Sequence, residues 1–253
     1  MPTAADTAGL LAGEVTIPVA GFPMPAYRAV PEGSGPWPIV LLVSEIFGVR
    51  PHIADVARRL ARALGAMVVA PELFVRQGDA KATDDVPTLL AEIIGKVPDP
   101  QVMGDLDATV AWAARMGGDA RRLAVTGFCW GGRATWLYAA HNPAVKAGVA
   151  WYGRLGGMPT GLQPQAPLDV ARRLHAPVLG LYGGEDTSIG LDTVEAMRAA
   201  LAGGNAASRA SSVFVYPSAK HAFFNDTRPN FDATAAGDAW QRCVAFLHSS
   251  LVA

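Results

Sequence analysis

Cysteine, aromatic side chains and charge are all scarce in this chain. Its 253 residues include only 2 cysteines, 8% aromatic residues and 17% charged residues. Two cysteines cannot form a disulfide framework, and without further ligands they cannot complete a four-ligand zinc site. We therefore expect a cytoplasmic protein that binds no metal.

An excess of one charge and long hydrophobic runs are also missing. The 21 Lys and Arg residues face 22 Asp and Glu residues, for a net charge of −1, which leaves no basic surface for nucleic acid or anionic membranes. The longest apolar runs, such as residues 39–43 and 67–70, are too short to cross a bilayer. The first 15 residues lack the basic and apolar segments of a signal peptide. We expect no nucleic-acid or membrane partner, and a monomer or small homo-oligomer.

The chain does contain enough apolar material for a large core, because 51% of its residues are hydrophobic. Short apolar runs alternate with segments whose apolar residues recur at helical spacing. The runs predict strands at residues 39–43, 66–70, 123–126, 147–151, 178–182 and 213–216. The spacing predicts helices at residues 53–64, 102–116, 131–140, 191–201 and 233–251, and a shorter helix at 88–95 inside a charged excursion.

This alternation predicts an α/β fold with a mostly parallel central sheet and helices on both faces. An N-terminal hairpin is expected from residues 14–19 and 26–30, which a Gly-Phe-Pro segment separates. No change in composition divides the chain, so we expect one domain over residues 1–253, with residues 1–13 as a poorly ordered tail.

The most informative segment reads Gly-Phe-Cys-Trp-Gly-Gly at residues 127–132, between a predicted strand and a predicted helix. It has the Gly-x-nucleophile-x-Gly pattern of a sharp turn that exposes a nucleophile at the edge of a sheet. Gly127 and Gly131 let the neighbouring backbone pass without a clash at Cβ, and the start of the helix favours a thiolate on Cys129. Cys129 is therefore the candidate nucleophile; the alternative is a small buried side chain at a strand end.

A nucleophile of this kind needs a base, and the base needs an acid that orients it. In this pattern the acid precedes the histidine along the chain. Of the 5 histidines, His221 is the one that follows a predicted strand in a loop at the same sheet edge as Cys129. Glu185 and Asp186 both follow the preceding strand, and we favour Asp186 because the Gly-Gly-x-Asp turn directs one side chain over the sheet.

Five segments are informative together: Ser-Glu-Ile-Phe-Gly at 44–48, Pro-Glu-Leu-Phe at 71–74, Gly-Phe-Cys-Trp-Gly-Gly at 127–132, Gly-Gly-Glu-Asp at 183–186 and His-Ala-Phe at 221–223. With them the chain resembles the dienelactone hydrolase (carboxymethylenebutenolidase) family of the α/β-hydrolase fold, over about residues 14–251. The resemblance implies that fold and a Cys-His-Asp triad, which falls on Cys129, His221 and Asp186. The sequence holds no phosphate-binding loop and no metal-ligand cluster, so we expect no cofactor.

The resemblance also implies a role for the glutamate of the Glu-Ile-Phe-Gly segment, here Glu45. In such enzymes this carboxylate contacts the thiol of the nucleophile and is displaced when substrate binds, so that the thiolate forms only when it is needed. Because Glu45 directly follows a buried strand, its carboxylate is desolvated unless it has a polar partner. The oxyanion donors would be the backbone N–H groups of Ile46 and Trp130.

The residues expected to bind the substrate differ from those of the family that the chain resembles. Well-studied members hold a substrate carboxylate with two arginines, one from the excursion after the second strand and one four residues beyond the catalytic histidine. Asn225 stands at the second place, and Arg228 is a conceivable substitute. The substrate-binding candidates are three aromatic side chains that could line an apolar pocket, and an arginine at the start of the excursion: Trp151, Tyr152, Phe223 and Arg76.

The chain is thus predicted to be a carboxylic ester or lactone hydrolase that opens enol lactones through a cysteine nucleophile and acts on a small-molecule substrate. A thiolate suits activated esters, lactones and thioesters, and suits amides poorly because it is a better leaving group than an amine. The first alternative is a small-ester or thioester hydrolase with a different substrate, which Asn225 favours. The second is a non-catalytic binding protein on the same fold, against which the complete set of Cys129, Asp186 and His221 argues.

Overall fold

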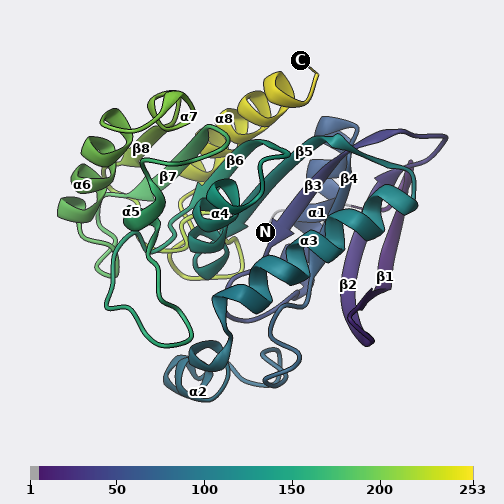
Figure 1. Ribbon diagram of the computed structural model, residues 1–253, viewed down its shortest axis with the longest axis horizontal. Coiled ribbons are helices and arrows are strands. Elements are labelled where there is room, and N and C mark those ends of the chain that lie inside the picture. The colour runs from purple at the N-terminus through teal and green to yellow at the C-terminus, as the bar shows by residue number, and fades with distance from the viewer. Residues whose placement is uncertain (1–5, 253) are drawn as a thin grey trace.

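The computed structural model describes residues 6–252, and these contain one eight-stranded sheet with the strand order β1-β2-β4-β3-β5-β6-β7-β8 (Figure 1). The hairpin of β1 (Leu10–Val19) and β2 (Phe22–Pro31) adds antiparallel to β4 (Met67–Pro71). All other neighbours are parallel to one another. They are β3 (Trp37–Val43), β5 (Gly118–Phe128), β6 (Val145–Trp151), β7 (Val178–Gly183) and β8 (Ser212–Tyr216). The predicted mostly parallel sheet with an N-terminal hairpin is confirmed.

The hairpin begins earlier and turns more tightly than the sequence indicates. Ala20 and Gly21 have φ values of 47° and 84°, the left-handed pair that a two-residue turn requires. Leu10 pairs with Pro31 and Gly13 with Arg28. The predicted disorder through residue 13 is therefore wrong from Leu10 onward, because the ladder with β2 satisfies that backbone; residues 1–5 lie outside the described residues.

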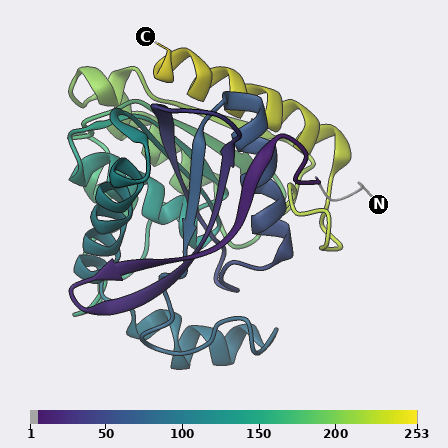
Figure 2. The same cartoon turned by 90° about the vertical axis from the view of Figure 1, so that its right-hand side faces the viewer.

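Helices cover both faces of the sheet (Figure 2). On one face, α1 (Pro51–Leu64) packs against α8 (Ala233–Leu251); on the other lie α3 (Asp99–Arg115) and α4 (Trp130–His141). As predicted, α1 ends at Leu64, and Gly65, whose φ is 60°, forms its left-handed cap. The α6 helix (Leu191–Ala202) lies beside the β7–β8 edge together with two short helices that the sequence did not predict, α5 (Pro167–Val170) and α7 (Ala206–Arg209) (Figure 1).

The charged excursion after β4 folds into α2 (Val86–Glu92) and a 3-10 turn, η1 (Ile94–Lys96), where one helix over 88–95 was predicted. Asp85 begins α2, because its carboxylate accepts a hydrogen bond from the Thr88 N–H at 3.0 Å. Leu89 and Ile94 are buried and attach the excursion to the core. The α2 helix lies at one end of the sheet, apart from the layers that cover its faces (Figure 1).

The parallel strands all end at one edge of the sheet, and the loops that follow them meet there. Ile46 follows β3, Cys129 follows β5, Asp186 follows β7 and His221 follows β8. In open α/β sheets this edge, at the carboxyl ends of the strands, is where ligands bind. The topology therefore brings together residues that are 35 to 175 positions apart in the sequence.

Candidate active site

The predicted sharp turn at Cys129 is present between β5 and α4. Cys129 has φ 54° and ψ −113°, a conformation that L residues rarely adopt. A Cβ on Gly131 would lie 2.3 Å from the Val43 carbonyl oxygen, and one on Gly127 would lie 2.4 Å from the Gly131 carbonyl oxygen. Both glycines are therefore required by close backbone contacts, as the sequence indicated.

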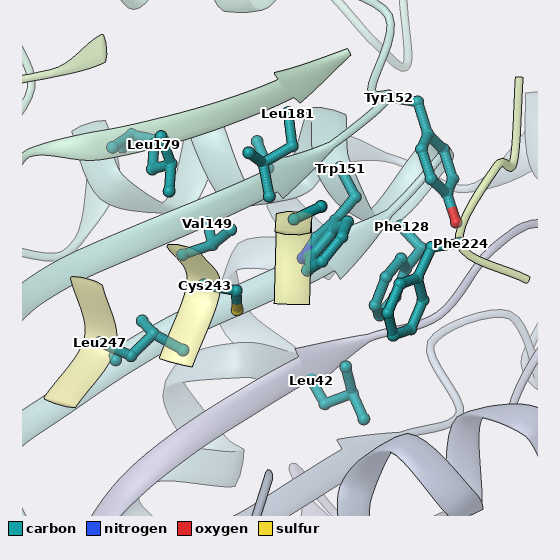
Figure 3. Packing of buried hydrophobic residues seen from close by; sticks show 14 of the residues in the cluster. Leu42, Phe128, Val149, Trp151, Tyr152, Leu179, Leu181, Phe224, Cys243 and Leu247 are labelled. Carbon is teal, nitrogen blue, oxygen red and sulfur yellow. The ribbon is translucent and has the colours of Figure 1, made fainter. Parts of the chain in front are cut away.

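The two cysteines have different environments. Cys129 is partly exposed and lines a cavity, whereas Cys243 on α8 is buried beneath the sheet beside Leu247 (Figure 3). Burial raises the pKa of the Cys243 thiol well above its usual value. Only Cys129 is placed to react with a ligand.

His221 lies between the other two candidate residues. Its Nδ1 is 2.7 Å from Oδ2 of Asp186, and its side chain lines the same cavity as Cys129, close enough for the charge of that residue to act on its pKa. Burial acts to lower the pKa of His221, but the hydrogen bonds and negative charges of Asp186 and Cys129 outweigh it and raise that pKa from 6.5 to about 10. The structure thus brings Cys129, His221 and Asp186 together.

The two acids of the β7 loop differ in their surroundings. The Asp186 side chain is 1% exposed, and its second oxygen accepts a hydrogen bond from the Ser188 N–H at 2.8 Å. Glu185 is exposed. Asp186 is therefore held in one orientation by two donors, whereas Glu185 points to solvent.

Two backbone N–H groups are available beside Cys129. Trp130 is the first residue of α4, so its N–H has no acceptor within the helix, and Ile46 lies in the loop after β3. Within residues 6–252 no hydrogen bond is recorded from either N–H group, and both residues line the same cavity as Cys129. Their position fits the predicted pair of oxyanion donors.

Glu45 is 7% exposed, and its polar partner is Asn225. The Asn225 amide donates to Oε2 of Glu45 at 3.0 Å. Among the described residues, neither Oε1 of Glu45 nor the hydroxyl of Tyr152 has a hydrogen-bond partner, so Glu45 forms no hydrogen bond with the Cys129 thiol in this structure. Burial, followed by the negative charges of Glu45 and Cys129, raises the pKa of Tyr152 well above its usual value.

A cavity of about 570 Å³ opens above these residues. It is lined by Glu45, Ile46, Cys129, Trp130, Tyr152 and His221 at its base, and by parts of α2, η1 and the loops after β6 and β8. Three of the four non-glycine residues with positive φ in the described chain, Cys129, Tyr152 and Ala222, line it. Backbone strain of this kind concentrates at functional sites.

Two predicted pocket residues, Trp151 and Phe223, belong to the core instead. Both are 0% exposed, and neither lines the cavity. The Trp151 indole N–H donates to Thr126 at 3.1 Å, and its ring lies 4.6 Å from that of Phe224 (Figure 3). Hydrophobicity alone could not separate a cavity wall from a packed interior; of the three aromatic candidates, only Tyr152 lines the cavity.

Arg76, the fourth substrate-binding candidate, is occupied elsewhere. Its guanidinium forms two hydrogen bonds with the buried carboxylate of Asp105 and lies 4.5 Å above the Phe22 ring. It does not line the cavity. The structure does not place Arg76 at the cavity, because it pairs with Asp105 on α3, an acidic partner 29 residues away that could not be identified from the sequence.

Arg228 does reach the cavity, and two further arginines that sequence reasoning missed, Arg133 and Arg154, line it with Arg228. Arg133 is held by Asp99 at 2.8 Å through both of its terminal nitrogens. The sequence contains no periodic signal for these positions, since they lie on the first turn of α4 and in the irregular loop after β6.

Within residues 6–252 there is no group of His, Cys, Asp or Glu side chains that could hold a metal ion. None of the helices in that part of the chain is long and apolar enough to cross a membrane.

Comparison with known proteins identifies the family. The family model described as "Dienelactone hydrolase family" matches residues 24–251. A protein of Methylorubrum extorquens AM1, named provisionally as a carboxymethylenebutenolidase, is 55% identical over 240 residues, which cover 94% of this chain and 81% of that protein. A protein of Escherichia coli K12 with the same provisional name is 53% identical over 234 residues, which cover 92% and 85%.

The crystal structure of a protein from Klebsiella pneumoniae subsp. pneumoniae MGH 78578, provisionally named a dienelactone hydrolase, is also similar. It matches with a TM-score of 0.91 and 54% identity, covering 94% of this chain and 98% of that chain. Sequence and fold therefore agree over nearly the whole length. The chain belongs to the dienelactone hydrolase family of the α/β-hydrolase fold.

Proposed function

We propose that the protein is a carboxylic ester and lactone hydrolase of the dienelactone hydrolase type, with Cys129 as nucleophile, His221 as base and Asp186 as the acid that orients His221. The observation that carries the proposal is the 2.7 Å contact between His221 and the buried Asp186, on a histidine that lines the same cavity as Cys129. Nucleophile, base and orienting acid in this order are the requirement for covalent catalysis by a cysteine.

Acylation begins when the Cys129 thiolate attacks the carbonyl carbon and the carbonyl electron pair moves onto oxygen. The N–H groups of Trp130 and Ile46 stabilise that oxyanion. Collapse of the tetrahedral intermediate breaks the bond to the leaving oxygen, which takes the proton from Nε2 of His221. The products of this half are an alcohol or enol and a thioester on Cys129; in a lactone the leaving oxygen remains tethered.

The electrostatics of the site support this proton transfer. The negative charge of Cys129 is one of the effects that raise the pKa of His221. That charge is lost when the thioester forms, so His221 becomes a stronger acid just when the leaving group needs a proton. Neutral His221 then takes a proton from water, the resulting hydroxide equivalent attacks the thioester, and the carboxylic acid and the Cys129 thiolate are released.

For Glu45 we propose the role that the family implies, a carboxylate that contacts the thiol in the resting enzyme and moves away as substrate binds. Its Oε1 lacks a hydrogen-bond partner within the described chain, so this oxygen is available for a second interaction. Its Oε2 contact with Asn225 gives the displaced position a defined partner.

A second candidate function is a small-ester or thioester hydrolase that does not act on dienelactone. The positions of two residues favour it. Asn225 is bound to Glu45, and Arg76 is bound to Asp105, so neither is available for a substrate carboxylate. A non-catalytic binding role is disfavoured, because the contact of His221 with Asp186, beside Cys129 in the same cavity, is the arrangement that turnover requires.

The test is hydrolysis of cis- and trans-dienelactone and of p-nitrophenyl acetate by the wild type, Cys129→Ala and the matched control Cys243→Ala. We expect Cys129→Ala to lose at least about 10³-fold in kcat/KM, since removal of a nucleophile leaves only binding and oxyanion stabilisation. Cys243→Ala should keep the activity. An active Cys129→Ala variant would refute the proposed nucleophile, and hydrolysis of the acetate alone would select the second candidate function.

A further inference from the structure

One wall of the cavity is apolar and exposed. Val86 and Leu90 on α2 are 40% and 47% exposed, and Met158 in the loop after β6 is 91% exposed. All three line the cavity, together with Phe47 and Ile94. Large apolar side chains gathered in the open at a cavity are typical of a surface that a ligand covers.

The α2 part of this wall is a built feature of the fold. Leu89, the neighbour of Leu90, is 0% exposed, and Ile94 is 3% exposed. The side chain of Gln163 donates to the backbone oxygens of Ile94 at 2.9 Å and Val97 at 3.2 Å, which joins η1 to the loop that carries Met158. Because its neighbours are anchored on both sides, Leu90 is presented to the cavity by a fixed backbone.

The position of α2 relative to the sheet indicates which half of a substrate it would contact. Leu89 and Ile94 belong to the same apolar cluster as Ile46 and Trp130, the residues of the oxyanion donors. His221 follows β8, on the other side of β5 in the strand order. Because His221 must face the leaving oxygen, the acyl group extends away from it, toward Ile46, Trp130 and α2.

We propose that α2 forms an acyl pocket, and that the preferred substrates are esters or thioesters of carboxylic acids with a medium-length alkyl chain or an aromatic ring. This inference rests on the proposed function and names the substrate class of the same site. The volume of about 570 Å³ falls in the range of about 300–1,000 Å³ that suits ligands much larger than an acetyl group.

The experiment is a series of p-nitrophenyl esters from acetate through butanoate and hexanoate to octanoate. The leaving group is constant, so differences in kcat/KM report the acyl group alone. Complete burial of a methylene group is worth roughly a fourfold factor, and in this half-open pocket we expect about twofold for each. The octanoate-to-acetate ratio of kcat/KM should therefore be on the order of 10–100.

Variants at Leu90 assign the effect to α2. Leu90→Ala should lower the octanoate-to-acetate ratio by about three- to tenfold, and Leu90→Met should restore most of it because its volume is similar. Leu11→Ala removes a side chain of matched exposure (51%) on β1 that does not line the cavity, and should leave the ratio unchanged. Circular dichroism and urea unfolding confirm that each variant is folded.

Separate results would overturn the inference and the proposed function. A ratio below one in the wild type, or a Leu90→Ala ratio equal to that of the wild type, would refute the acyl pocket while leaving the hydrolase in place. A chain-length preference seen in alkyl acetates but not in the p-nitrophenyl series would place the apolar group on the alcohol side and refute the assignment to the acyl group. If the wild type hydrolysed none of the esters, the proposed function itself would be refuted.

Discussion

The substitution Asp186→Asn tests the orienting role of this carboxylate with little change in shape. The carboxylate accepts two hydrogen bonds, one from the Ser188 N–H at 2.8 Å and one from His221 at 2.7 Å. An amide has a single acceptor oxygen. The asparagine side chain of the variant would therefore either leave the Ser188 N–H without its partner or turn its NH₂ group toward Nδ1 of His221.

Either orientation weakens catalysis. If the NH₂ group faces Nδ1, His221 must adopt the tautomer that carries its proton on Nε2, and it can no longer accept a proton there. If the oxygen faces Nδ1, the charge that stabilises the imidazolium is still missing, and the pKa of His221 falls from about 10 toward 6.5. The corresponding substitution in a serine protease lowers kcat about 10⁴-fold, and we expect about 10²–10⁴-fold here.

The assay is kcat/KM for a p-nitrophenyl ester, together with an NMR titration of His221 in the wild type and the variant. Glu185→Gln is the matched control, since it removes a carboxylate from the adjacent, exposed position of the same loop, and should stay within about threefold of the wild type. If Asp186→Asn kept more than about a third of the activity, or if the pKa of His221 did not move, the proposed orienting role of Asp186 would be refuted.

Three further predictions concern stability. In urea unfolding, Gly131→Ala should lower the free energy of unfolding by about 3 kcal/mol, because its Cβ would lie 2.3 Å from the Val43 carbonyl oxygen. Gly104→Ala in α3 should raise the free energy of unfolding by about 0.5–1 kcal/mol, because the added Cβ meets nothing within 4 Å. The pKa of His221 is raised from 6.5 to about 10, so its contribution to stability is complete below pH 6.5 and is lost as the pH rises through 10. The free energy of unfolding should fall more steeply between these pH values in the wild type than in His221→Gln, and equal slopes would contradict the raised pKa.

The parts of the molecule that depend on local sequence were predictable. Predicted strand segments each lie in or beside an observed strand, and α8 has the predicted bounds, because buried strands and amphipathic helices leave strong periodic signals. The meeting of Cys129, Asp186 and His221 was also predictable, since strands in a parallel sheet end at the same edge. The loop order along the chain is sufficient for that inference.

The walls of the cavity were not predictable, because they depend on contacts between distant segments that have no periodic pattern. The sequence suggests that the guanidinium of Arg76 is available to a ligand, but in the structure it pairs with Asp105 on α3. Trp151 is as apolar as a pocket residue, yet it is packed between the sheet and the Phe224 ring. The apolar cavity wall on α2 could not be predicted because α2 is a short helix in a charged segment. Its Leu89 is buried in the core, whereas the next residue, Leu90, lines the cavity.

Asn225 is informative about how this chain recognises its substrate. Its amide nitrogen bonds Glu45 at 3.0 Å, and its oxygen accepts from the Thr227 hydroxyl at 2.7 Å. Both polar atoms of the side chain therefore bond within the protein, the nitrogen to Glu45 and the oxygen to Thr227. In the described residues Arg154 has no recorded ion pair, and Arg228 approaches Asp84 only to 3.6 Å. Since Arg154 and Arg228 both line the cavity, an anionic group on a substrate would meet these two cations on the rim rather than residue 225, and the apolar wall of α2 would remain free for the acyl group.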